Sequence, residues 1–195
     1  MKWWDKNPTF HLADLYYGKS SKNFGFTIGA NAYLDSGFRK DESEERYRLN
    51  GTFYFKPEKN KKLKAGLSYN AQYQDVGVFV LWKNDSMGYE PQDNTIDRQK
   101  SIRLSVDPYV KLYDKYNNKH YFKSRYYLVT TGNTENLYAN SLAEMYYFDY
   151  QFQRNMGVGN TLTAGFSNTV NRVESWVFGD HLLENAAAYA QFESK

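Results

Sequence analysis

Apolar and polar residues alternate with a period of two along most of this chain. The clearest example is segment 24–34. One of its faces carries the apolar residues Phe24, Phe26, Ile28, Ala30, Ala32 and Leu34, and the other carries Gly25, Thr27, Gly29, Asn31 and Tyr33. A period of two places successive side chains on opposite faces of a β-strand. The pattern therefore predicts an all-β chain whose strands have one apolar and one polar face.

The same alternation recurs in nine segments, which we predict to be antiparallel strands. Their ranges are 9–17, 24–34, 46–55, 64–74, 101–113, 119–130, 143–153, 161–170 and 185–194. Strands of about 9–11 residues with an apolar outer face and a polar inner face are typical of transmembrane β-barrels. Only helices and closed barrels satisfy every backbone group in lipid. We therefore expect these strands to form part of a transmembrane β-barrel.

The predicted connections alternate in length. Short ones fall at 18–23, 56–63, 114–118 and 154–160, and longer ones at 35–45, 75–100, 131–142 and 171–184. Outer-membrane barrels combine short periplasmic turns with long external loops, whereas soluble sandwiches have no reason to alternate. Pro108 lies inside the predicted strand 101–113, where it removes a hydrogen-bond donor, so we expect a bulge or a strand end there.

Composition agrees with an outer-membrane location. The chain has 19 Tyr, 13 Phe and 4 Trp, and barrels carry such rings as girdles at the membrane–water interfaces. No run of 18 apolar residues predicts a transmembrane helix. The absence of cysteine excludes disulfides, and a net charge of +3 is too small to indicate nucleic acid. No signal peptide is visible at the start, so we expect an internal piece of a longer exported protein.

Eleven short stretches, taken in order, carry a family resemblance. They are FTIGAN at 26–31, DSGFR at 35–39, ERYRLN at 45–50, LWKN at 81–84, GYEP at 88–91, VDPY at 106–109, SRYY at 124–127, YQFQ at 150–153, LTAG at 162–165, GDH at 179–181 and AYAQ at 188–191. Together they resemble the barrel domain of TonB-dependent receptors of the Bacteroidetes type, which includes SusC-like nutrient importers. The similarity runs from about residue 7 to the end.

The resemblance implies a barrel of about 22 strands, closed by an N-terminal plug and opened by the TonB complex. It implies active uptake of a bulky nutrient, a glycan or a siderophore, across the outer membrane of a Gram-negative bacterium. The partners it implies are outer-membrane lipid, the TonB complex and a surface lipoprotein. Residues 1–195 show no plug, TonB box, signal peptide or C-terminal closing strand, so they are expected to form a partial barrel domain unable to transport alone.

The barrel prediction assigns two groups of candidate residues. Charged residues expected to face the lumen, to hydrate it, pair with the plug or guide substrate, are Arg48, Arg103, Asp107, Lys111, Lys123, Arg125 and Asp149. Loop residues expected either to stack on a sugar or a partner lipoprotein, or to pack the loops together, are Phe79, Leu81, Trp82, Tyr89 and Trp176.

Nothing in the sequence indicates catalysis, a cofactor or a metal site. The histidines His11, His120 and His181 are far apart and lack metal-ligand spacing. No nucleophile motif stands out, so the chain is expected not to be an enzyme. Two alternatives stay open: a small autonomous outer-membrane barrel with an adhesive or structural role, and a soluble β-barrel or sandwich that binds a small ligand.

Overall fold

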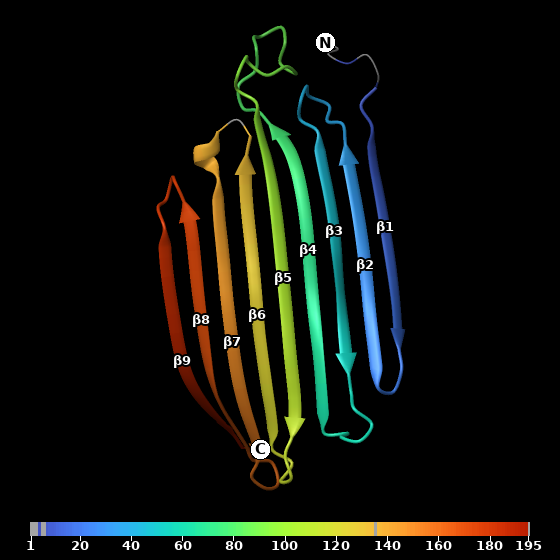
Figure 1. Ribbon diagram of the computed structural model, residues 1–195, viewed down its shortest axis with the longest axis vertical. Helices are drawn as coiled ribbons and strands as arrows, with labels where there is room; N and C mark the ends of the chain where they lie inside the picture. The colour runs from blue at the N-terminus through green and yellow to red at the C-terminus, as the bar shows by residue number, and fades with distance from the viewer. Residues whose placement is uncertain (1–3, 5–6, 135, 195) are drawn as a thin grey trace.

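The computed structural model describes residues 4, 7–134 and 136–194. They form one antiparallel sheet of nine strands in sequence order, which confirms the all-β prediction (Figure 1). The elements are β1 Phe10–Ser20, β2 Phe24–Asp35, β3 Glu44–Phe55, β4 Leu63–Val78, β5 Asp97–Tyr113, β6 Lys119–Asn133, the short 3₁₀ helix η1 Leu137–Ala139, β7 Ser141–Asn155, β8 Thr161–Ser175 and β9 His181–Glu193. Within this part of the chain, no helix has the length and apolar character needed to cross a membrane.

All nine predicted strands are present, but several run further than predicted toward the longer loops. β8 ends at Ser175 and β9 begins at His181, so their connection is only 176–180. The prediction of a long fourth loop was therefore wrong, and that connection is as short as the β7–β8 turn at 156–160. The alternation of apolar and polar residues did not predict the last part of β8. Arg172 and Glu174 lie there on the face that carries apolar residues in the first part of the strand.

The bulge or strand end expected at Pro108 is absent. β5 pairs with β4 without interruption, and Leu67 lies opposite Pro108. Toward β6 the register is the same on both sides of the proline, from Val106↔Tyr126 to Tyr109↔Lys123. Two residue pairs are missing between them. The missing N–H thus weakens one ladder locally without shifting the register.

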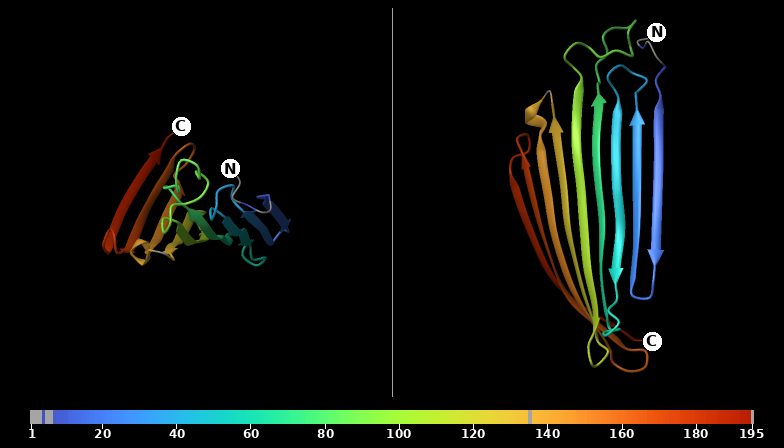
Figure 2. Two further views of the ribbon diagram at one scale, coloured as in Figure 1. Left: turned by 90° about the horizontal axis from the view of Figure 1, so that it is seen from above. Right: turned by 45° about the vertical axis from the view of Figure 1, so that its right-hand side comes forward.

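The sheet is curved and open. Seen from above it forms a trough, with β1 and β9 at the two edges and unpaired with each other (Figure 2). Polar residues crowd together on one face, where Gln72, Ser101 and Asp149 are buried. Among the described residues, Phe79 is the one buried hydrophobic side chain. The sheet therefore has no hydrophobic core of its own, and most of its apolar face is open to whatever surrounds it.

The apolar face carries a band of limited height. In β4 the apolar set runs from Leu63 to Tyr73, and in β5 from Leu112 to Ile102, eleven residues in each strand. Charges begin one step beyond: Arg98 Nε lies 2.7 Å from Asp75 Oδ1. Arg172 Nη1 lies 3.6 Å from Glu144 Oε2 at the same end of β7 and β8. The band therefore has the strand length that crossing a bilayer requires.

Aromatic rings lie on this apolar face at two levels. The rings of Phe26 and Phe53 are 6.3 Å apart and those of Phe53 and Tyr69 are 5.9 Å apart, level with the middle of the band in β4. Tyr126 and Tyr146 lie in the same cross-strand row as Tyr69, whereas Tyr47 stacks on Tyr73 at the charged border. Rings gather at the interfaces of membrane barrels, and the pair of Tyr47 and Tyr73 has such a position.

The β5–β6 turn at 114–118 is organised around one carboxylate. The backbone N–H groups of Tyr116 and Asn118 donate to Asp114 Oδ1 at 2.8 and 2.9 Å, and the Asn118 side-chain amide donates to Asp114 Oδ2 at 2.8 Å. Asn117 has a φ of 61°, a left-handed conformation that asparagine tolerates. The carboxylate therefore replaces the backbone partners that this turn lacks.

Acid is expected to loosen this turn. Desolvation raises the pKa of Asp114, but the hydrogen bonds from Asn118, Tyr116 and His120 outweigh it and lower that pKa. A lowered carboxyl pKa contributes stability above its unfolded value of about 3.9, and that stability is lost as pH falls through the folded value. Amide hydrogen exchange at Tyr116 and Asn118 should accelerate, after correction for intrinsic rates, below about pH 4. In Asp114→Asn the corrected rates should not change over that range, and an unchanged wild type would contradict the account.

Candidate functional site

The seven charged residues predicted to share one face do share it. The register places Arg48 on β3, Arg103, Asp107 and Lys111 on β5, Lys123 and Arg125 on β6 and Asp149 on β7, all on the polar side of the sheet. They form two groups. Arg48 and Arg103 flank Gln72 in one cross-strand row, and Arg48 donates through Nε and Nη2 to Gln72 Oε1 at 3.1 and 2.7 Å.

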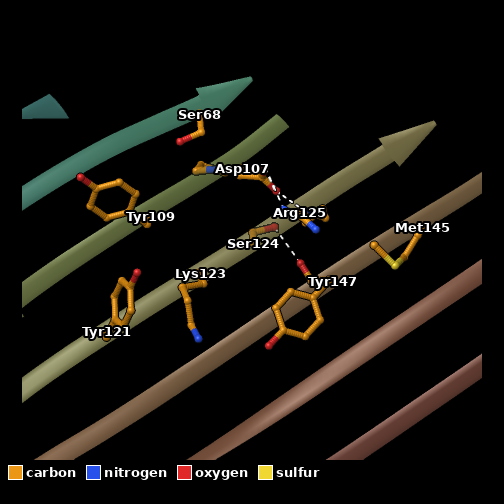
Figure 3. A pocket seen from close by; sticks show the side chains of 10 residues that line it. Ser68, Asp107, Tyr109, Tyr121, Lys123, Ser124, Arg125, Met145 and Tyr147 are labelled. Atoms are coloured by element: carbon orange, nitrogen blue, oxygen red, sulfur yellow. Dashed lines mark hydrogen bonds and ion pairs between the residues drawn. The ribbon is translucent and has the colours of Figure 1, made fainter. Parts of the chain in front are cut away.

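The other five residues lie in or beside a hollow of about 620 Å³ on β5, β6 and β7. Figure 3 shows Asp107, Tyr109, Tyr121, Arg125 and Tyr147 projecting around it. Lys111 lies beside the hollow, next to Tyr121. The Lys111 Nζ is 4.5 Å from the centroid of the Tyr121 ring. The hollow is open and mixes charged groups with phenol rings.

Two ion pairs fix the charges of the hollow. Arg125 donates to both carboxylate oxygens of Asp107, with Nη2 3.2 Å from Oδ2. Lys123 Nζ lies 3.1 Å from Asp149 Oδ1, and the Tyr189 hydroxyl donates to Asp149 Oδ2 at 3.3 Å. Asp149 is only 4% exposed, and a buried carboxylate is costly unless it has partners such as these. The arrangement fixes charge positions and provides no nucleophile with an adjacent base.

Removing the cation beside Asp149 is expected to destabilise the sheet. Lys123→Met leaves the buried carboxylate with the hydroxyl groups of Tyr189 and Tyr147 but with no cation. The Lys123 side chain is 38% exposed, so water already screens part of its attraction to Asp149. We therefore expect the free energy of unfolding to fall by roughly 1–2 kcal/mol. The measurement is urea unfolding in detergent micelles, where the midpoint should fall and the slope should not change. Lys59→Met in the exposed turn 56–62 is the control. Equal midpoints for both variants would contradict the role of the ion pair.

The sequence did not indicate the tyrosines of this site. Tyr54 lies over Gly25 and Tyr109 over Gly66, because each glycine faces its tyrosine across the strands and has no side chain. A Cβ on Gly66 would lie 2.4 Å from the Tyr109 ring. Only the register between strands brings such pairs together. Gly25 and Gly66, each on the polar face of its strand, were visible in the sequence. Without the register, however, the tyrosine opposite each glycine could not be identified.

The loop candidates separate into buried and exposed residues. Phe79 is 3% exposed, and the Arg39 guanidinium lies 4.5 Å from its ring centroid, so it packs the loops together. The Tyr89 ring meets the Phe38 ring edge-on, with 5.9 Å between the centroids, although Tyr89 is itself exposed. Leu81 and Trp82 are exposed on loop 79–96, and Trp176 is 71% exposed beside Tyr138 on another loop. No ring contact between described residues joins Trp82 to Trp176, so they do not form one platform.

The histidines lie apart, with His11 on β1, His120 on β6 and His181 on β9. Among residues 4, 7–134 and 136–194, no three His, Asp or Glu side chains gather in a way that could hold a metal ion. His120 Nδ1 lies 2.8 Å from the Tyr150 hydroxyl, and His181 Nε2 lies 2.7 Å from the carbonyl oxygen of Phe178. Both rings therefore have local hydrogen-bond partners.

No protein-family model matches this chain, and no curated protein matches it significantly. Functional conclusions therefore depend on the two faces of the sheet and on the residues that line them.

Proposed function

We propose that this chain forms part of the wall of an outer-membrane β-barrel, with its apolar face against lipid and its polar face toward an aqueous lumen. The observation that carries the proposal is an uncovered apolar face on a single-layer sheet, in which one hydrophobic residue is buried among those that the structure describes. A soluble sandwich covers such a face with a second sheet, and none is present in the described residues. Lipid would cover an apolar face of this extent, which supports the proposal.

The height of the apolar band supports the same proposal. Eleven residues of β4 and of β5 alternate apolar and polar, the stacked rings of Tyr47 and Tyr73 lie at one border, and paired charges begin beyond it. These are the features of a strand that enters and leaves a bilayer. A soluble ligand-binding barrel has no reason to limit its outer apolar residues to a band.

The open edges favour a larger barrel over a small autonomous one. Within the described part of the chain, β1 pairs only with β2 and β9 only with β8, so both edges leave a row of backbone N–H and C=O groups without partners in the sheet. In lipid such groups must be paired. Further strands would therefore have to close the barrel, and an outer-membrane barrel of the TonB-dependent receptor type, importing a glycan or a siderophore, is the one that the resemblance supports.

The test of this function combines location with uptake. In cells that produce the intact protein, we expect it in the outer-membrane fraction, and we expect uptake of one labelled oligosaccharide or ferric siderophore to require both the gene and the proton gradient. Outer-membrane location without any loss of uptake in the deletion strain would favour the adhesive or structural alternative. Recovery in the soluble fraction would overturn the membrane proposal as a whole.

A further inference from the structure

Lysine side chains gather around three tyrosine rings at the short-turn end of the polar face. We call this cluster the lysine ladder, and its members are Lys56, Lys64, Lys111, Lys119 and Lys123 with Tyr54, Tyr109 and Tyr121. The ladder crosses β3, β4, β5 and β6 and continues into the hollow of Figure 3. The register brings members from four strands together, while Lys119, Tyr121 and Lys123 share β6.

Tyr121 is the centre of the ladder. The ammonium groups of Lys111, Lys119 and Lys123 lie 4.5, 5.8 and 5.2 Å from its ring centroid. Lys64 Nζ lies 4.8 Å from the Tyr54 ring and 5.9 Å from the Tyr109 ring. The negative faces of the rings attract cations and hold these flexible side chains near one another. The rings of Tyr54 and Tyr109 are themselves fixed because they lie over glycines, and the Tyr121 ring meets that of Tyr109 edge-on, with 6.2 Å between the centroids.

The ladder has fewer carboxylates than lysines. Lys123 pairs with Asp149, whereas Lys64, Lys111 and Lys119 have no carboxylate within ion-pair distance among the described residues. The acidic groups of the adjacent turns have other partners: Asn23 donates to Glu58 at 2.6 Å, and Asp114 accepts hydrogen bonds from its own turn. Lys59, Lys61, Lys62 and Lys115 add further positive charge at this end.

Three neighbouring ammonium groups repel one another unless an anion lies between them. We propose that the lysine ladder is a binding site for a multivalent oxyanion of the phosphate class, held by Lys64, Lys111 and Lys119. Lysine suits such a group because each ammonium offers three donors to phosphate oxygens. The phenol hydroxyl groups of Tyr109 and Tyr121 supply further donors beside them. The site belongs to the polar face, so it does not depend on whether lipid covers the other face.

Titration with inorganic pyrophosphate tests this site. The intact protein, purified in a zwitterionic detergent, should bind pyrophosphate, and binding should weaken as KCl is raised because salt screens the charges. The double substitution Lys111→Gln and Lys119→Gln should weaken binding roughly tenfold or more, since two charge-assisted contacts are lost. Lys83→Gln in loop 79–96, at the other end of the sheet, is the matched control and should bind like the wild type. Circular dichroism verifies that all variants are folded.

The source of the anion is distinguished by competition. If the natural ligand is a lipid headgroup, phosphatidylglycerol added to the micelles should displace pyrophosphate while phosphatidylcholine should not. If it is a soluble phosphate compound, neither lipid should compete, and both results support the site. Absence of pyrophosphate binding, or equal affinity in the double variant and Lys83→Gln, would overturn the proposal. Binding of oligoglutamate without any binding of pyrophosphate would overturn it as well, in favour of an acidic protein segment.

Discussion

Leu104→Arg is expected to abolish stable membrane insertion, and Phe26→Arg and Ile28→Arg are expected to do the same. All three positions lie on the apolar face, level with residues inside the apolar band of β4 and β5. An arginine facing lipid near the bilayer midplane costs roughly 2–4 kcal/mol, which is a 30- to 900-fold change in an equilibrium. The measurement is the fraction of protein that resists carbonate extraction from outer membranes, or that folds into lipid vesicles.

The matched control is the next residue of the same strand. Ser105 lies on the polar face opposite Asn70, so Ser105→Arg adds the same side chain where charges such as Arg103 and Asp107 already stand. It should insert as the wild type does. Normal insertion of all three apolar-face variants would show that this face does not meet lipid. Equal failure of Ser105→Arg would mean that added charge, and not the face, prevents insertion.

Gly66→Ala is expected to destabilise the sheet by roughly 1–3 kcal/mol, which is the usual range for forcing extra volume into a packed site. The new Cβ would lie 2.4 Å from the Tyr109 ring, so the ring would have to move away from its place between Lys64 and Lys111. The measurement is the midpoint of urea unfolding in micelles. Pyrophosphate affinity of the same variant should fall too, because the ladder loses one of its fixed rings.

Two comparisons isolate the contact between Gly66 and Tyr109. Gly88→Ala in loop 79–96 meets no atom within 4 Å, so it should be neutral or slightly stabilising. In a Tyr109→Ala background, Gly66→Ala should lose most of its effect, which gives a coupling energy between the two positions. Additive effects in the double variant would contradict the account, since they would mean that the glycine is required for another reason.

The strands were predictable because one physical rule governs most of the chain. Alternation placed all nine, and the structure confirms each of them. The rule failed where polarity changes along a strand: Arg172 and Glu174 interrupt the apolar face, so the end of β8 was assigned to a loop. At Pro108 the sequence predicted an interruption that is absent. Its missing N–H donor suggested a bulge, but pairing with β4 keeps the register of β5.

The candidate site was predictable only as a face. The alternation of side chains along each strand was enough to place Asp107, Lys123, Arg125 and Asp149 on the same face. Which of them form ion pairs depends on the residues that lie opposite one another across the strands. The contact of Tyr109 with Gly66 depends on the register in the same way. Phe79 is buried under Arg39 because two loops pack together, and no local pattern reports such a contact.

The measurement that tests the central proposal most directly is a cysteine scan along residues 102–106 of β5. The chain has no native cysteine, so each single variant carries one spin label at a known position. In a bilayer, labels at 102, 104 and 106 should be reached by oxygen dissolved in lipid, and labels at 103 and 105 by a water-soluble nickel complex. This period of two is the predicted result. Equal access of the nickel complex to all five positions would contradict a lipid-facing apolar side and, with it, the proposed barrel.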